Sequence, residues 1–389
     1  MKTEHVVHFD SAASMKDLDR ETIDLVVTSP PYPMIEMWDE SFSRQNPEIG
    51  RFLSQGEARP AFELMHRELD SVWRELFRVL KPGGLACVNI GDAARTLVKD
   101  FALYPNHARI QSGMTDLGFL SLPSIIWRKQ TNAPNKFMGS GMYPPGAYVT
   151  LEHEFILIFR KGAKRAFVRD EEINNRRESA YFWEERNQWF SDVWLDLKGT
   201  QQALGDRQAR SRSGAFPLEL PYRLIAMFSV KNDTVLDPFA GAGTTAAASL
   251  ALGRNSVGYE IEPAMRAAIA GSLGQVVPLA EAKAKARLDN HVQFVQAKLE
   301  AGYAFKHQNR HYGFPVMTGQ EADLLFRVPL ASVALDQDRF AAEYQVAAFA
   351  YEAGTAAPPS PAPVATPPRG RGRPKKAGKK ALAEKKLFD

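Results

Sequence analysis

The chain has 389 residues, 44% of them hydrophobic and 24% charged, and a formal net charge of +4. This length predicts two or three domains, and the lack of any apolar run near the ~20 residues of a bilayer-spanning helix argues against a membrane protein. The first ten residues lack the charged-then-apolar pattern of a secretory signal, and the one cysteine, Cys87, excludes disulfides within the chain. One cysteine and eight scattered histidines show no zinc-ligand spacing, so we expect a cytoplasmic protein without a metal.

Apolar runs and helical patterns alternate through residues 1–353. Short β-branched or apolar runs predict strands at 6–10, 23–29, 85–92, 122–128, 154–160, 234–238 and 256–261. Apolar residues at helical spacing predict helices at 57–80, 217–229 and 244–252, and the KPGG sequence at 81–84 ends the first of them. Strands that alternate with helices predict an α/β fold with a doubly wound, mostly parallel sheet.

Changes in composition divide the chain into four regions, the last of which is the C-terminal tail. Residues 1–162 and 211–353 are the two halves of the α/β body, although no pattern in 264–350 predicts a role for that stretch. Between the halves, 163–210 has five arginines from Arg165 to Arg186 and six aromatic residues from Tyr181 to Trp194 without a clear period, and we interpret it as an inserted target-recognition region. Its arginines are open to two interpretations, phosphate contacts or a solvated face, and its tryptophans are interpreted as the core of a small subdomain.

Residues 354–389 form the fourth region, a linker followed by a basic tail. Six of the fifteen residues at 354–368 are proline, which predicts an extended, disordered segment. From 369 to 389, nine Lys or Arg stand against two acids, a net charge of +7, so the other 368 residues carry about −3. Such a tail is typical of proteins that bind a polyanion.

The sequence Thr-Ser-Pro-Pro-Tyr at 28–32 suits the methylation of an amino group on a base. The lone pair of that nitrogen is delocalised into the ring, so catalysis needs an acceptor for an amino hydrogen and oxygens near the developing positive charge, all held by a rigid turn. Two prolines, Pro30 and Pro31, restrict φ and remove N–H donors, and an aromatic ring can stack on an extruded base. Ser29, the Pro30 carbonyl and Tyr32 can meet these needs. The alternative is a purely structural Pro-Pro turn with a packed tyrosine.

A second motif, VLDPFAGAGTT at 235–245, places a Gly-rich turn between a predicted strand and a predicted helix. Gly241 and Gly243 permit close backbone approach to a ligand. No lysine follows them, so the turn is not a phosphate-binding P-loop, and its match to the dinucleotide-binding fingerprint is loose. Asp237 can attract the ammonium or sulfonium of a cationic ligand, and Glu260, at the end of the next strand, can accept both hydroxyls of a ribose.

Together, TSPPY, the DPFAGAGT sequence some 200 residues later and the GYEIE sequence at 258–262 resemble the DNA amino-methyltransferases with permuted motif order, the β group. The resemblance covers roughly residues 5–265 and includes VVHFD, KPGG, SIIWRK, EHEFILIFRKG, DVWLDL and AFPLELPYRLI. The chain departs from the family at 213–215, where Ser-Gly-Ala stands in place of the His-Pro pair that members often carry before the FPLEL segment.

The resemblance implies a Rossmann-like methyltransferase fold, S-adenosyl-L-methionine as the cofactor and double-stranded DNA as the substrate. The implied catalytic loop consists of Ser29, Pro30, Pro31 and Tyr32. The implied cofactor site consists of Asp10 at the adenine, Phe216 beside the cofactor, and Asp237, Phe239, Gly241, Gly243, Thr244 and Glu260. Whether a cognate restriction endonuclease exists, and whether the protein dimerises, stay open.

Serine at the first position of the catalytic motif occurs in this family mostly with cytosine amino methylation, and Asp or Asn mostly with adenine. We therefore predict the N(4)-amino group of cytosine as the target, with the adenine amino group as the alternative. Methylation at carbon 5 needs a cysteine nucleophile and is disfavoured, because Cys87 lies in an apolar predicted strand. Methylation of RNA or protein amides, and DNA binding without catalysis, are the other classes that stay open.

The sequence PPRGRGRPKK at 367–376 resembles an AT-hook. Arginines in an extended segment fit the narrow minor groove of A·T-rich DNA. The predicted DNA contacts are Arg371, Arg373, Lys375 and Lys376, and the alternative is a generic solvated basic tail. Either tail predicts salt-sensitive affinity for DNA and association with the nucleoid.

Overall fold

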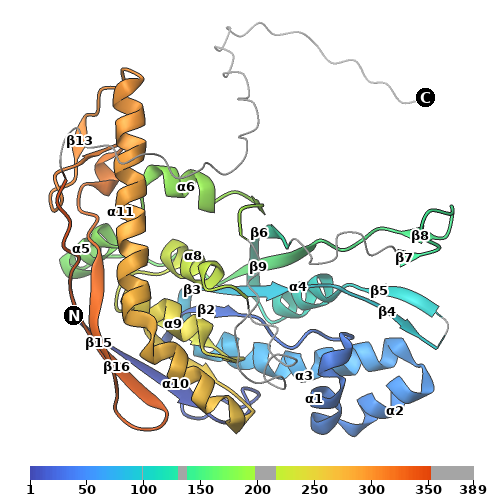
Figure 1. Ribbon diagram of the computed structural model, residues 1–389. Coiled ribbons are helices and arrows are strands. Elements are labelled where there is room, and N and C mark those ends of the chain that lie inside the picture. Colours follow the sequence, from blue (N-terminus) through green and yellow to red (C-terminus); the bar gives the residue numbers. More distant parts are fainter. Residues whose placement is uncertain (99, 130–137, 198–215, 352–389) are drawn as a thin grey trace, which may run out of the picture. The chain divides into compact units, whose positions relative to one another are not determined.

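The computed structural model describes residues 1–98, 100–129, 138–197 and 216–351. Within these residues one ten-stranded sheet has the strand order β10-β6-β9-β3-β2-β11-β12-β1-β16-β15 (Figure 1). Its strands are β1 (Lys2–His8), β2 (Ile23–Thr28), β3 (Leu80–Ile90), β6 (Phe119–Arg128), β9 (His153–Lys161), β10 (Val193–Trp194), β11 (Thr234–Asp237), β12 (Asn255–Tyr259), β15 (Arg327–Ala334) and β16 (Arg339–Val346). Three small hairpins or pairs are separate from it: β4 (Ala93–Leu97) with β5 (Asp100–Tyr104), β7 (Met138–Gly139) with β8 (Ala147–Tyr148), and β13 (His307–Gln308) with β14 (Pro315–Val316).

The centre of the sheet is parallel. Strands β3, β2, β11, β12 and β1 pair with one another in parallel, whereas β9 and β16 flank them in antiparallel pairing. The predicted mostly parallel α/β fold is therefore confirmed. Strands β11 and β12, from the second half of the chain, lie between β2 and β1, so the two halves interleave in one sheet.

Helices cover both faces of the sheet (Figure 1). They are α1 (Asp39–Gln45), α2 (Pro47–Gln55), α3 (Ala58–Val79), α4 (Asn106–Asp116), α5 (Asp170–Glu178), α6 (Trp183–Trp189), α8 (Glu219–Phe228), α9 (Thr244–Leu252), α10 (Arg266–Gly274) and α11 (Val276–Glu300), with single 3₁₀ turns η1 (Glu36–Trp38), η2 (Pro263–Met265) and η3 (Gly319–Glu321). Along β2, Leu25 and Val27 pack with the apolar residues of α8, α9 and α10, and Val26 packs with those of α3 and α4. This alternation of side chains gives two hydrophobic layers, one on each face.

The predicted helix at 57–80 is α3, and it ends where expected, at Val79. The KPGG sequence, however, lies inside strand β3 and is not a separate stop, because β3 begins at Leu80 and its pairing with β2 shifts register between Ile23 and Leu25. Gly83 has φ +85°, and a Cβ there would lie 2.5 Å from the backbone nitrogen of Arg165. A glycine is therefore needed at this irregular point because another segment passes directly over it.

The described part of the predicted recognition region packs against the body. Trp189 and Trp194 lie in the same hydrophobic cluster as α8 and α9, and Trp183 keeps 37% of its surface exposed. The stretch 264–350, for which the sequence predicted no role, contains α10, α11 and the β15–β16 hairpin, which extends the sheet beyond β1.

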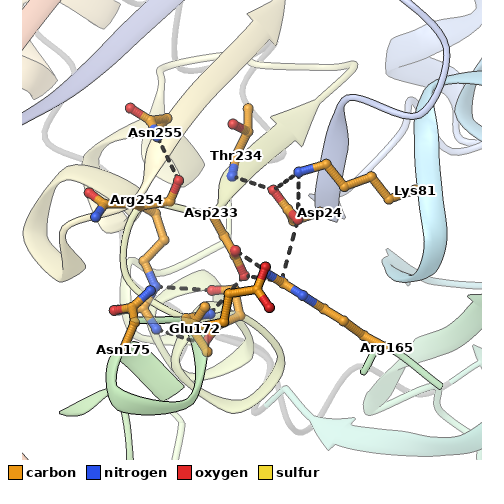
Figure 2. Close-up of polar contacts among 12 residues, drawn as sticks. Asp24, Lys81, Arg165, Glu172, Asn175, Asp233, Thr234, Arg254 and Asn255 are labelled. Carbon is orange, nitrogen blue, oxygen red and sulfur yellow. Dashed lines mark hydrogen bonds and ion pairs between the residues drawn. The ribbon is translucent and has the colours of Figure 1, made fainter. Parts of the chain in front are cut away.

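An ion-pair cluster joins the two halves at the amino ends of β2 and β11 (Figure 2). Arg165 Nη1 lies 2.8 Å from Asp233 Oδ2 and 3.3 Å from Asp24 Oδ1, and Lys81 Nζ lies 2.8 Å from both oxygens of Asp24. The Thr234 backbone N–H donates to Asp24 Oδ2 at 3.0 Å. Burial and the neighbouring Asp24 charge raise the pKa of Asp233. Arg165 lies between two carboxylates that would otherwise repel each other.

The buried residue His5 makes the free energy of unfolding depend on pH. The His5 ring contacts Thr3 Oγ1 at 3.0 Å and Ser256 Oγ at 2.8 Å, and burial lowers the pKa of His5 to about 3. The unfolded chain takes up a proton at this residue below about pH 6.5, and the folded chain does so only near pH 3. Stability from His5 is therefore complete above pH 6.5 and is lost progressively as the pH falls toward 3.

We expect His5→Gln to make the free energy of unfolding less sensitive to acid, by roughly 1 kcal/mol between pH 6 and pH 5. Urea denaturation at the two pH values measures this difference. The exposed His311 provides the control, since His311→Gln should keep the wild-type dependence. An unchanged pH dependence in His5→Gln would contradict the assignment.

Candidate active site

The two sequence motifs meet at one edge of the sheet. Strands β2 and β11 are parallel neighbours, with Leu25 opposite Val235 and Val26 opposite Leu236. The loops that follow them, 29–32 and 238–243, therefore leave the sheet side by side at its carboxyl edge, where ligands bind in open α/β sheets. Strands β12 and β1 follow in order and bring Glu260 and Asp10 to the same edge.

A cavity of about 490 Å³ lies between these loops. Of the residues predicted from the sequence, those that line it are Asp10, Ser29, Pro30, Pro31, Tyr32, Phe216, Phe239, Gly241, Thr244 and Glu260. Its opposite wall comes from η1 and α1, with Met37, Trp38 and Phe42 among the lining residues. Clefts of roughly 300–1,000 Å³ are typical of ligand sites. A larger groove of about 800 Å³ along α11 contains none of the predicted residues.

The glycine bend is held to Glu260 by backbone hydrogen bonds. The Gly241 N–H donates to Glu260 Oε2 at 2.8 Å, and the Glu262 N–H donates to Oε1 at 2.9 Å. Gly241 and Gly243 have φ values of +53° and +78°, which favour glycine, and a Cβ on Gly243 would lie 3.2 Å from Ile269 Cγ2. Burial raises the pKa of Glu260. Each oxygen of Glu260 keeps acceptor capacity beyond its backbone bond, which suits the two hydroxyls of a ribose.

Asp237 joins the two loops and does not line the cavity. Its Oδ1 accepts a hydrogen bond from Thr28 Oγ1 at 2.6 Å and another from the Phe239 N–H at 3.0 Å. The side chain is buried, and burial raises its pKa. The geometry therefore favours a positioning role over the direct attraction of a cationic ligand that the sequence suggested.

A polar network lies behind Tyr32. The Tyr32 hydroxyl accepts from Ser29 Oγ at 3.1 Å and from Asn89 Nδ2 at 2.9 Å, and it donates to Glu154 Oε2 at 2.9 Å. Lys129 Nζ lies 2.9 Å from Glu154 Oε1. Burial, followed by the charge of Glu154, raises the pKa of Tyr32, so the phenol stays neutral. All the bonding positions of this hydroxyl are occupied, which fixes the ring at the cavity wall.

The sequence reasoning missed Asn89, Glu154 and Lys129. The signal for the first two was present, because Asn89 interrupts the apolar run at 85–90 of β3 and Glu154 directly precedes the apolar run at 155–159 of β9. Lys129, which directly follows strand β6, offered no signal of its own. Buried polar groups need partners, but a one-dimensional pattern does not identify them.

The predicted DNA contacts Arg371, Arg373, Lys375 and Lys376 lie outside the described residues, as does the 213–215 departure. Among the residues that the structure describes, no group of three or more His, Cys, Asp or Glu side chains could hold a metal ion. No helix in that part of the chain is long and apolar enough to cross a membrane. Cys87 is buried in β3, and burial raises the pKa of its thiol, consistent with its interpretation as a core residue.

Comparison with known proteins places the chain in a family. The profile of a family described as "DNA methylase" matches residues 23–270. The chain is 48% identical over 346 residues to "Type II methyltransferase M.MthZI" of Methanothermobacter thermautotrophicus, covering 89% of this chain and 96% of that protein. It is 46% identical over 287 residues to "Type II methyltransferase M.MjaI" of Methanocaldococcus jannaschii, covering 70% and 92%.

A solved structure extends the match to the fold. The Thermus thermophilus protein TTHA0409, solved in complex with S-adenosyl-L-methionine, superposes with a TM-score of 0.55 at 33% identity, covering 70% of this chain and 96% of that one. The family match includes both the 28–32 loop and the glycine bend, the two motifs on which the sequence resemblance rested. The chain therefore belongs to the DNA methylase family, the N(4)/N(6) amino-methyltransferases that the sequence resembles.

Proposed function

We propose that this protein transfers a methyl group from S-adenosyl-L-methionine to the N(4)-amino group of cytosine in duplex DNA. Membership of the DNA methylase family supports the reaction class and the DNA substrate. The observation that carries the finer proposal is the cavity in which the Ser-Pro-Pro-Tyr turn faces the glycine bend. When bound, the cofactor supplies an electrophilic methyl group on a sulfonium.

The residues of the cavity suit that cofactor. Glu260, held by two backbone N–H groups, would accept the ribose hydroxyls, and Asp10 would lie at the adenine. Phe216 and Phe239 supply apolar walls, and Phe239 is held edge-on by Trp73 at a ring-centroid distance of 6.2 Å. Gly241 lines the cavity without a side chain, so the cofactor can approach its backbone.

Ser29 is the residue that would activate the target amino group. Because its hydroxyl proton is donated to Tyr32, the lone pairs of Ser29 Oγ are free to accept an amino hydrogen of the base. That hydrogen bond localises the nitrogen lone pair and makes it a better nucleophile. The Pro30 carbonyl oxygen would stabilise the positive charge that develops on the amino nitrogen. The neutral Tyr32 ring lines the cavity and would stack on an extruded base.

Long-read sequencing of DNA from cells that express the gene tests the proposal, because it reports the modified base and its sequence context together. We expect N(4)-methylcytosine at one short sequence. Modified adenine would overturn the cytosine assignment and support the alternative, and unmodified DNA would overturn the function.

We further propose that a restriction endonuclease of the same specificity exists, as the type II names of the relatives suggest. Protection of modified DNA from that nuclease is its test.

We expect Ser29→Ala to lower turnover by about 10²–10³-fold, because it removes a hydrogen bond made to the reacting group. The dissociation constant of S-adenosylmethionine, measured by calorimetry, should stay unchanged. Tyr32→Ala should likewise lower turnover by orders of magnitude. Glu154→Gln should lower turnover less, about tenfold, since an amide keeps one acceptor for Tyr32 but loses the charge that holds Lys129.

Ser54→Ala on α2 is the matched control for these variants and should behave as wild type, because the Ser54 hydroxyl donates to the Arg51 carbonyl of its own helix, away from the cavity lining. Normal methylation by both Ser29→Ala and Tyr32→Ala would remove the catalytic assignment.

Asp237 distinguishes positioning from charge attraction. Asp237→Asn keeps an oxygen that can accept from Thr28 and from the Phe239 N–H, but it removes the negative charge. A positioning role predicts a cofactor dissociation constant within about threefold of wild type for Asp237→Asn and a large increase for Asp237→Ala. Isothermal titration calorimetry measures both. A loss of tenfold or more in Asp237→Asn would restore the direct electrostatic role.

A further inference from the structure

Two hairpins project from the body on the same side of the molecule (Figure 1). One is β4–β5, and the other, here called the tip hairpin, consists of β7, β8 and the turn at 140–146 between them. They contact each other through Phe101 and Tyr148, whose rings stack at 4.5 Å with an interplanar angle of 14°. Arg95 of β4 binds Asp39 of α1 through two bonds of 2.8 and 2.6 Å, and α1 lines the cavity.

The tip hairpin is connected to the cavity at both ends. Lys129 precedes this excursion of the chain and Glu154 follows it. Both residues line the cavity, and they form an ion pair at 2.9 Å. The excursion therefore leaves from and returns to the wall that holds Tyr32.

The turn of the tip hairpin is ordered by its own bonds. The Ser140 N–H donates to the Gly146 carbonyl at 2.9 Å, and the Ser140 hydroxyl donates to the Tyr143 carbonyl. Gly139 has φ +69°, and a Cβ there would lie 2.1 Å from the Gly146 oxygen, so the crossing of the two strands requires glycine. This turn nevertheless holds two large apolar side chains in water: Met142 is 85% exposed and Tyr143 is 80% exposed.

The stretch that carries the tip hairpin has no acidic side chain that would repel a phosphate. No Asp or Glu occurs from 128 to 151, and the carboxylates that follow, Glu152 and Glu154, are paired with Arg128 and Lys129. An acid-free stretch with exposed methionine, tyrosine and proline suits a partner that offers both phosphates and flat apolar faces. Side chains of this kind insert between base steps where a protein distorts a duplex, and extrusion of a base requires such distortion.

We propose that the tip hairpin binds duplex DNA next to the target base, with Met142 and Tyr143 as the contacting side chains. The proposal rests on the proposed function, since it is the DNA substrate that brings a duplex to the cavity. Three arginines in the described part of the predicted recognition region already have partners within the chain. Its Arg165 pairs with Asp233, Arg169 pairs with Glu172, and Arg176 lies over the Phe167 ring.

The test compares the double variant Met142→Ala/Tyr143→Ala with wild type in the full-length protein. The probe is a fluorescein-labelled 30-base-pair duplex that carries the sequence found by long-read sequencing, and its dissociation constant is measured by fluorescence anisotropy. We expect that constant to rise about tenfold or more, the scale of one lost stacking contact. The dissociation constant of S-adenosylmethionine should be unchanged, which shows that the fold and the cofactor site are intact.

Two further variants sharpen the result. Leu335→Ala changes an apolar side chain that is 49% exposed in the turn between β15 and β16, and this variant should bind the duplex as wild type does. Tyr143→Trp keeps an aromatic face and should retain affinity. Unchanged duplex affinity in the double variant would overturn the proposal, as would light scattering that shows a wild-type dimer and a monomeric variant, because the tip would then cover a second copy of the chain. Failure of the wild type to methylate DNA would instead overturn the proposed function.

Discussion

The parallel pairing of β2 with β11 is the constraint on which the site depends. It aligns strands about 210 residues apart in the chain, so that the loops after Thr28 and Asp237 leave the sheet at the same edge. The 2.6 Å hydrogen bond between these two side chains joins the loops directly, and an intramolecular hydrogen bond typically contributes about 0.5–1.5 kcal/mol. At the opposite end of the same strands, Arg165 bridges Asp24 and Asp233. The pair of strands is thus held at both ends, and the space between the loops is left for ligands.

Electrostatics behind Tyr32 explains how a polar group is kept fixed at an apolar cavity wall. Burial of the Glu154 carboxylate would be costly without partners, and it has three in Lys129, Asn89 and the Tyr32 hydroxyl. The same burial raises the pKa of Tyr32, so the ring carries no charge that would repel electron-rich groups. The Ser29 hydroxyl directs its proton into this network and its lone pairs outward. Ser29, Asn89 and Glu154 therefore bond directly to the Tyr32 hydroxyl, and Lys129 acts on it through Glu154. These residues come from β2, β3, β6 and β9 or from the loops that follow those strands.

The parts of the chain outside the motifs complete the body around this site. Helix α11 packs along α9 and β15, and the β15–β16 hairpin extends the sheet beyond β1. Residues 163–197 are tied to this body by a buried ion pair between Glu185 of α6 and Arg287 of α11, with N–O distances of 2.5 and 2.7 Å. Trp189 and Trp194 contribute to the core, whereas Trp183 stays 37% exposed. The hairpins between β3 and β9 carry exposed apolar side chains, among them Met142 and Tyr143, and contain no recognised motif.

The sequence by itself determined the α/β class, the strands of the central sheet, the Ser-Pro-Pro-Tyr turn and the glycine bend, because each depends on local properties. These are β-branched runs that favour buried strands, prolines that stiffen a turn and glycines that adopt positive φ. The tertiary structure alone decided which groups meet. In it, Asp237 accepts a hydrogen bond from Thr28, and Glu154 and Lys129 lie behind Tyr32. KPGG forms part of β3 next to the Arg165 backbone, and the hairpin within 264–350 extends the sheet beyond β1. The reason is physical: a hydrogen bond or ion pair between residues 25 to 210 positions apart depends on strand order and register, and neither leaves a trace in the local sequence of either partner.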